Sequence, residues 1–452
     1  MKAKNILLPV GLGLLMTGMI TPVHAVDPFG VYQNDKVPVC QRPDLSKELT
    51  LLDAMEIAVC ESPTLKSSYL STQVSAAGYG QSLSNYLPTV SGTGSLDQTS
   101  TKVDGNGHSD LTDTSARVSL NWLLLDFGGR SGTADKFKSY LSSAYYGYDS
   151  TLQTTLYNVA DKYYSVLSAE EKFEGLQKSE EASKKAFEEA NSRYKLGLVP
   201  LSDKLQAETA YAQARLETTV AKKTIALERG NLANLLNLPP YTHFQLYRQD
   251  KTIEDKVKLG DIEKLITTAL ENRPDYKAKQ KDKEGAVFNV QTAKSGHLPT
   301  LSAVGSAGAG KEVRFGEDGT YSSSIGLQLS IPIFSGFDQS YKVGQARYEL
   351  KQLEEQVNQL KIDIENEVWA AVQDYKTSYQ THQISKTLLA SAEESERVAF
   401  ASYKVGKVNI LTLLDAQSQL ASARIEYSTS FYNFMIAKNN LMRALGQMEK
   451  KV

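Results

Sequence analysis

The feature that most constrains the fold of this chain is an internal duplication. Residues 193–238 align without a gap on residues 402–447, at an offset of 209 positions, and 13 of the 46 aligned pairs are identical. A repeat of this kind means that one structural unit occurs twice in the chain. The sequence therefore divides into a first repeat, 50–238, and a second repeat, 261–447.

Both repeats predict the same order of elements. A first helix ends at a Leu-Pro-Thr step, because the residue before a proline is pushed towards extended geometry. Two strands follow, since hydrophobic and polar residues alternate with a period of two over 116–123 and 324–331. Their partner strands are rich in Gly, Ser and Ala. The predicted β-hairpins cover residues 89–127 and 300–334, with polar loops at 102–113 and 314–320.

A long helix follows each hairpin. Hydrophobic residues recur at steps of three and four over 131–194 and 338–403, which is the coiled-coil period. These segments have 64 and 66 residues, so at 1.5 Å per residue each helix reaches roughly 95 to 100 Å. Each ends at a glycine turn, at 196–200 or 405–408, and a return helix follows. The predicted fold class is mainly helical, with long coiled-coil helices and four strands per chain.

The segments outside the repeats predict that the chain is exported and that a connector joins the two repeats. Residues 1–25 combine two lysines with an apolar stretch and a small-residue cleavage site, which is typical of a signal peptide. An N-terminal arm follows at 26–49. A charged connector that opens with two prolines occupies 239–260, and 448–452 form a C-terminal tail.

The chain has only two cysteines, Cys40 and Cys60. In an exported protein we expect them to form one disulfide, because the compartment is oxidising. The bond would close a loop of about 20 residues and contribute about 3 kcal/mol in the chain-entropy model. A metal site needs more Cys or His at ligand spacing than this chain offers, so no metal is expected.

The composition and the motifs exclude several function classes. The 50 basic and 52 acidic residues are spread along the chain, which argues against a nucleic-acid partner. After residue 25 no apolar run approaches the roughly 18 residues of a spanning helix, whereas alternating strands of a membrane β-barrel remain allowed. Residues 305–311 match most of a phosphate-binding loop, but Glu312 stands at its hydroxyl position. We therefore expect neither an enzymatic activity nor a bound cofactor.

Four strands with one apolar face cannot form a membrane barrel alone, because such barrels need about eight strands or more. Two copies would supply eight strands and three copies twelve. The duplicated plan and the paired turns RYKLGLVPLSD and SYKVGKVNILTLLDA resemble the TolC family of outer membrane channel proteins over residues 45–447. The resemblance implies a trimer that shares a twelve-stranded β-barrel in the outer membrane and a helical barrel across the periplasm. The arm, the connector and the tail would then form an equatorial belt.

The resemblance also implies a function and partners. The chain would be the passive exit duct of a tripartite export system, for type I protein secretion, small-molecule efflux or both. Its partners would be a periplasmic adaptor protein and an inner-membrane ABC transporter or efflux pump that supplies the energy. The alternatives are an elongated periplasmic adaptor and a coiled-coil structural protein.

By resemblance, the functional residues lie at the two glycine turns. In this family the closed gate joins a hydroxyl-Asp pair of the first turn to a Tyr and an Arg of the second turn. Here Val408 stands at the arginine position, and Lys407 is an imperfect substitute. Thr412 replaces one of two pore-lining aspartates, so a weakly locked gate with one acidic ring is expected. The alternatives without a functional role are that the glycines only cap helices and that Asp415 is a solvated charge on a helix face. The candidate adaptor contacts are Leu196, Gly197, Leu198, Val405, Gly406 and Lys407, and the candidate gate residues are Ser202, Asp203, Tyr403 and Asp415.

Overall fold

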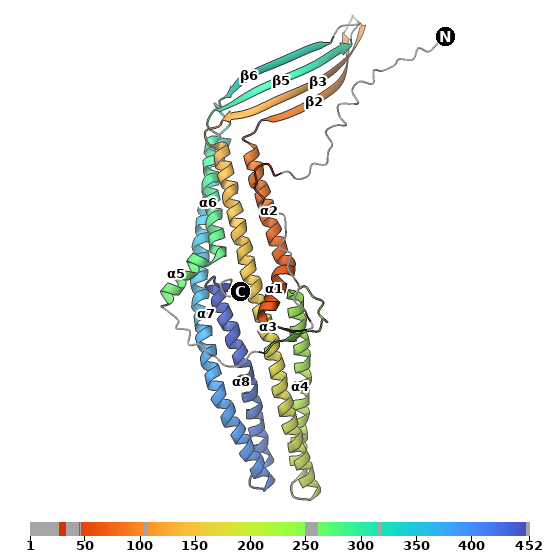
Figure 1. The fold of residues 1–452 in the computed structure, drawn as a ribbon, viewed down its shortest axis with the longest axis vertical. Coiled ribbons are helices and arrows are strands. Elements are labelled where there is room, and N and C mark those ends of the chain that lie inside the picture. Colours follow the sequence, from red (N-terminus) through yellow and green to blue (C-terminus); the bar gives the residue numbers. More distant parts are fainter. Residues whose placement is uncertain are drawn as a thin grey trace, which may run out of the picture.

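The computed structural model describes an elongated molecule with a β-sheet at one end and two helical hairpins at the other (Figure 1). The described residues are 27–32, 45, 47–103, 107–248, 261–313 and 319–448. The expected signal peptide, Cys40, residues 249–260 of the connector and residues 449–452 of the tail lie outside them. Cys60 is disulfide-bonded, but its pairing with Cys40 stays a prediction because Cys40 is not described.

Both repeats contain the same series of elements. The first repeat contains α1 (Leu51–Glu61), α2 (Pro63–Ser84), β2 (Thr89–Val103), β3 (Gly107–Leu125), α3 (Gly129–Lys195) and α4 (Leu201–Leu235). The second contains α5 (Ile262–Asn272), α6 (Pro274–Ser295), β5 (Thr300–Val313), β6 (Thr320–Ser330), α7 (Asp338–Lys404) and α8 (Ile410–Ala444). Two short strands, β1 (Glu48–Leu49) and β4 (Gln245–Leu246), pair in parallel outside the repeats.

The first helix of each repeat differs from the single helix that the sequence predicts. It is divided in two, at Pro63 in the first repeat and at Pro274 in the second. Proline lacks the N–H that a continuous helix needs, but it fits the first turn of a new helix. The break therefore separates α1 from α2 and α5 from α6.

The long helices are confirmed. Helices α3 and α7 have 67 residues each, and the return helices α4 and α8 have 35 residues each. At 1.5 Å per residue, α3 and α7 extend over roughly 100 Å. Within the described ranges, no helix combines the length and the apolarity that a membrane crossing requires.

The helices lie side by side in one layer. Helix α3 contacts α2 and α6 in the half near the sheet, and it contacts α4 and α8 in the half near the turns. Helix α7 packs against α6 and then against α8. The order across the layer is therefore α2–α3–α6–α7 above and α4–α3–α8–α7 below (Figure 1). Helix α7 forms one edge of the layer, and α2 and α4 form the other.

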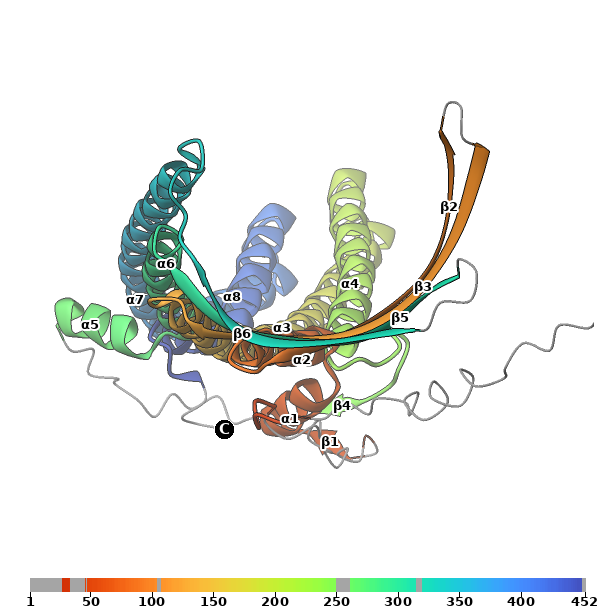
Figure 2. The ribbon, with the colours of Figure 1, turned by 90° about the horizontal axis from the view of Figure 1, so that it is seen from above.

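The four long strands form an antiparallel sheet with the order β2–β3–β5–β6. The sheet is strongly curved when it is seen from above (Figure 2). Strands β2 and β3 pair from Thr89 opposite Asn121 to Val103 opposite Gly107. The predicted polar loop at 102–113 is therefore wrong for most of its length. Backbone pairing continues through polar residues, because the ladder hydrogen bonds do not depend on side-chain polarity.

Two left-handed residues join each sheet strand to its long helix. Phe127 and Gly128 have φ of +47° and +98° before α3, and Gly336 and Phe337 have φ of +63° and +65° before α7. A bulky residue at positive φ is rare and costs conformational energy. The same costly turn stands in both repeats, and it redirects the chain from the sheet into the helical layer.

The middle of the molecule is held by two hydrophobic clusters. In the first, α1, β1 and β4 pack against α3, α4 and α8. The Tyr163 hydroxyl donates to the Tyr247 carbonyl at 2.8 Å and lies 3.0 Å from the Leu49 carbonyl, which ties both short strands to α3. In the second cluster α5 packs against α7 and α8. Helix α1 begins with a capping box between Thr50 and Asp53.

Candidate gate and docking tips

The two glycine turns close the helical hairpins at the end opposite the sheet (Figure 1). Gly197 and Gly406 have φ of +73° and +75°, a left-handed conformation that glycine adopts without strain. In each turn the glycine N–H donates to the carbonyl three residues earlier, and the next N–H donates to the carbonyl five residues earlier, all at 2.9 Å. This pair of bonds is a Schellman cap. The duplication therefore extends to the backbone geometry of the tips.

The turns expose aliphatic side chains. Leu196 is 73% exposed, Leu198 64% and Val405 68%. A helix cap needs the glycine but does not need an exposed aliphatic neighbour. Grouped apolar side chains on a surface are typical of a contact site, so the tips offer more than a chain reversal.

Next to the turns, towards the middle of the molecule, the four helices meet through small residues. Alanines let the helices approach closely, and a few larger side chains fill the remaining space. The buried members of this cluster are Ala186, Ala190, Ala207, Ala399, Tyr403, Ile410, Leu413 and Ala416. Val408 packs against the cluster. The position that resembles a gate arginine is thus part of an apolar core.

Arg193, in the last turn of α3, reaches across to the end of α7. Its Nη1 group donates to the carbonyls of Tyr403 and Lys404, the second at 3.2 Å. The guanidinium carbon lies 5.0 Å from the centre of the Tyr403 ring. Carbonyls at a helix C-terminus have no donor within their own helix and carry partial negative charge. Arg193 therefore caps α7 from the other hairpin and ties the two hairpins together.

The sequence reasoning did not identify Arg193. The equivalent position in the second repeat is Ser402, so the duplication gives no signal there. The resemblance places the gate arginine in the second turn, at the position of Val408. The available clue was that Arg193, which has no basic counterpart in the second repeat, directly precedes the Tyr-Lys pair that both repeats share.

Tyr403 lies at the centre of this contact. Its side chain is 2% exposed, and its hydroxyl makes no hydrogen bond within the described part of the chain. Burial raises the pKa of Tyr403; the charge of Arg193 opposes this shift and that of Asp203 adds to it. Ser202 Oγ donates to Asp203 Oδ1 at 3.3 Å. Asp203 is thus close enough to Tyr403 for its charge to act on the ring hydroxyl, but that hydroxyl bonds to neither Ser202 nor Asp203.

The remaining candidate, Asp415, lies in the second turn of α8. Its side chain is exposed, and it accepts a hydrogen bond from Gln419 Nε2 at 2.8 Å. Thr412 has a local role, because its N–H and its hydroxyl both donate to Asn409 Oδ1 at 2.9 Å. Asn409 is the N-cap of α8. Next to the second glycine turn, the start of α8 therefore carries a single exposed carboxylate, that of Asp415.

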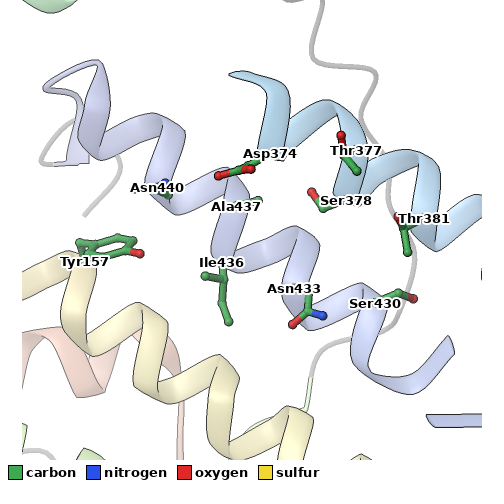
Figure 3. Close-up of a pocket in the computed structure, with 10 residues that line it drawn as sticks. All are labelled: Tyr157, Asp374, Thr377, Ser378, Thr381, Ser430, Asn433, Ile436, Ala437 and Asn440. Carbon is green, nitrogen blue, oxygen red and sulfur yellow. The ribbon is translucent and has the colours of Figure 1, made fainter. Parts of the chain in front are cut away.

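A separate groove of about 470 Å³ lies between α3, α7 and α8 (Figure 3). Asp374 is the one charged residue among those that line it, and it lies 30 positions before Lys404. That spacing corresponds to roughly 45 Å along α7, so the groove is remote from the tips. In the part of the chain that the structure describes, no cluster of three or more His, Cys, Asp and Glu residues could hold a metal ion.

Known proteins share this arrangement. The family model described as outer membrane efflux protein matches residues 54–238 and 265–447. Protein CyaE of Bordetella pertussis is 28% identical over 85% of this chain and 81% of its own length. Outer membrane protein TolC of Escherichia coli K12 is 25% identical, over 98% and 87%. The crystal structure of the Campylobacter jejuni CmeC outer membrane channel has the same fold, with a TM-score of 0.79, 19% identity and coverage of 88% and 85%.

Proposed function

The chain belongs to the outer membrane efflux protein family, and on this premise we propose that it works as a homotrimer whose glycine turns receive a periplasmic partner. The protein is an outer membrane channel of tripartite export systems and extends into the periplasm. Proteins of this family transport and do not catalyse. Family membership excludes the two alternatives, a periplasmic adaptor and a coiled-coil structural protein.

The observation that carries the channel function is the contrast between the two faces of the sheet. One face exposes hydrophobic side chains of β3 and β6: Val118, Leu120, Trp122, Ile325, Leu327 and Leu329. The other face carries a row of four serines in register, one from each strand: Ser91, Ser119, Ser306 and Ser324. An apolar outer face and a polar inner face are the requirements of a water-filled passage through lipid.

The free edges of the sheet support assembly from several copies. Strands β2 and β6 each have one neighbour in the four-stranded sheet, and the sheet curves towards closure (Figure 2). An unpaired strand edge cannot remain in hydrocarbon, because its backbone groups would lack partners. If β2 of one copy pairs with β6 of the next, the contact is head-to-tail, and such a contact forms a ring when its rotation closes. Three copies then supply the twelve strands.

The edges of the helical layer support the same contact. Helix α4 buries Ala207 and Ala221 and exposes an apolar stripe, of which Leu216 and Val220 also border a groove towards α3 and α8. The stripe, at helical spacing, consists of Leu205, Ala212, Leu216, Val220 and Leu227. Helix α7, at the other edge, exposes Ile362, Trp369, Ile384 and Val398. Two unpartnered apolar stripes on opposite edges suit a ring in which α4 meets α7 of the next copy.

The tips supply the proposed partner site and gate. Leu196, Gly197 and Leu198 of the first turn and residues 405–407 of the second would contact the periplasmic adaptor. Ser202, Asp203 and Tyr403 would restrain the hairpins at rest, together with Arg193, which binds the end of α7. Asp415 would contribute an acidic ring. An inner-membrane ABC transporter or efflux pump would supply the energy. The cargo would be secreted protein, small molecules or both.

A clean deletion strain tests the function. Its secreted-protein profile and its sensitivity to dyes, detergents and antibiotics are scored side by side, with the chain returned on a plasmid as the control. Loss of a secreted protein alone would assign the channel to protein export, and hypersensitivity alone would assign it to efflux. Both defects together would indicate a shared exit. No defect in either assay would contradict the proposed export function.

A further inference from the structure

The tips are basic, although the whole chain has a formal net charge of −2. Residues 193–204 contain three basic side chains and one acidic side chain, and residues 403–412 contain two basic side chains and no acidic one. Arg193 is engaged with the end of α7. Lys195, Lys404 and Lys407 are exposed. Among the described residues, no carboxylate oxygen lies within 4.0 Å of their ammonium groups, the distance that defines an ion pair. Three unpaired cations therefore lie at the end of each molecule.

The two turns repeat one short pattern. Lys195 precedes Leu196 and Gly197, as Lys404 precedes Val405 and Gly406. In each case the lysine is exposed, the aliphatic side chain is more than 60% exposed and the glycine is left-handed. The caps have the same hydrogen bonds, so the backbone of each lysine stands in the same place relative to its aliphatic neighbour. The Lys404 ammonium also lies 5.4 Å from the centre of the Phe400 ring. Each turn therefore offers a partner the same combination, a cation beside an apolar contact.

We propose that the periplasmic adaptor docking on these tips presents a carboxylate beside an aliphatic side chain, and that this carboxylate pairs with Lys195 on one turn and with Lys404 on the other. The inference rests on the proposed function, since it requires a partner at the tips. In a trimer the pattern occurs six times, and a partner that repeats one contact surface can engage every turn with the same residues. Lys407, which has Leu198 as its counterpart, distinguishes the second turn.

Electrostatics favours a carboxylate over a neutral or basic partner surface. Exposed lysines gathered at one end of a ring repel one another and create a positive potential there. An acidic partner surface relieves that repulsion, speeds the encounter and discriminates against wrong partners, because like charges at an interface are strongly unfavourable. The aliphatic side chains then supply the apolar centre of the contact.

The test reverses the charge at both lysine positions in the full chain. Lys195→Glu with Lys404→Glu is expressed in the deletion strain, and its export is compared with that of the parental chain. The matched control is Lys178→Glu with Lys386→Glu, which makes the same charge change at exposed positions of α3 and α7 away from the tips. We expect the tip variant to reach the outer membrane as the same oligomer with export reduced at least about tenfold. The control should export like the parent.

A suppressor selection identifies the partner charge. Regained export should arise through substitutions of Asp or Glu by Lys or Arg in one periplasmic protein. Unchanged export in the tip variant, or suppressors only at uncharged positions, would overturn the proposal. If the double Glu variant does not assemble, the variant Lys195→Gln with Lys404→Gln is tested instead. Full export through its assembled channels would overturn the proposal, and a severalfold loss of export would support it. If the parental chain, expressed in the deletion strain, restored no export, that result would contradict the proposed function instead.

Discussion

Arg193 shows how a single residue can hold together two elements that are distant in the sequence. It belongs to the first repeat, and the carbonyls it binds belong to the second repeat, about 210 positions later. Its bond goes to the backbone, so the identity of the side chains at the end of α7 matters less than the position of that end. The cation–π contact with Tyr403 adds a preference for the aromatic ring that fills the tip cluster.

Replacing Arg193 should loosen the tips. Arg193→Ala removes a charged donor from two helix-end carbonyls and costs about 1 to 2 kcal/mol, the lower range for such bonds because the side chain is half-buried. We expect a higher resting conductance in planar bilayers than for the parental channel. Arg397→Ala is the control, since Arg397 is exposed on α7 and pairs with Glu394 of its own helix. Equal conductance in the two variants would remove Arg193 from the gate.

Asp415 should control ion selectivity. Its carboxylate is exposed near the end of α8, where three copies would form an acidic ring. Asp415→Asn removes the charge and retains an acceptor for Gln419, and it should lower the preference for cations as much as Asp415→Ala does. Asp415→Glu should preserve the preference. Reversal potentials in planar bilayers measure it, and unchanged values in all three variants would leave Asp415 as a solvated charge.

At the scale of elements, the turns and the helices place opposite demands on glycine. Gly406 closes a helix at positive φ, where a side chain is strained. Gly147 lies inside α3, where a methyl group would meet nothing within 4 Å and where alanine is the better helix former. The same residue type is therefore required in the turn and merely tolerated in the helix.

Alanine substitutions at these two glycines should have opposite effects. Gly406→Ala should destabilise the protein by about 1 to 2 kcal/mol. The added methyl group would also lie 3.4 Å from Arg193 Nη2. Gly147→Ala should stabilise α3 by up to about 1 kcal/mol. The midpoint of thermal unfolding, followed by circular dichroism in detergent, measures both changes. A decrease of the same size for both variants would show that the left-handed turn is not the cause.

At the scale of the whole molecule, the edges of the single chain fit the proposed ring of copies. The layer of helices has two apolar edges, and the sheet above it has two unpaired edges on the same sides. A monomer in water gains nothing from either feature. Both features are what the proposed ring requires of each chain.

Breaking the apolar stripe of α4 should therefore separate the copies. Leu216 is 57% exposed in the single chain, and Leu216→Glu would bury a charge at the proposed contact between chains. Ala226→Glu adds the same charge to an exposed position of α4 outside the stripe. We expect light scattering of the extracted protein to show monomers for the first variant and the parental oligomer for the second. An intact oligomer in both would contradict the assignment of this edge to the interface.

The sequence by itself determined the repeating plan. The offset of 209 positions, the heptad spacing and the alternating strands predict two long helical hairpins and four strands, because periodicity is a local property that reports which face of an element is buried. The glycines at the two turns were equally clear, since few other residues adopt their backbone conformation. The extension of β2 and β3 into the predicted loop was missed, because backbone pairing leaves no mark in side-chain polarity.

Only the tertiary structure decided which elements meet. The order α4–α3–α8–α7, the bond from Arg193 to the end of α7 and the place of Val408 in the tip cluster join residues of different repeats. No local pattern encodes such pairs. Residues about 210 positions apart come together because whole helices pack, and the free energy of that packing depends on surfaces that exist only after the helices have formed.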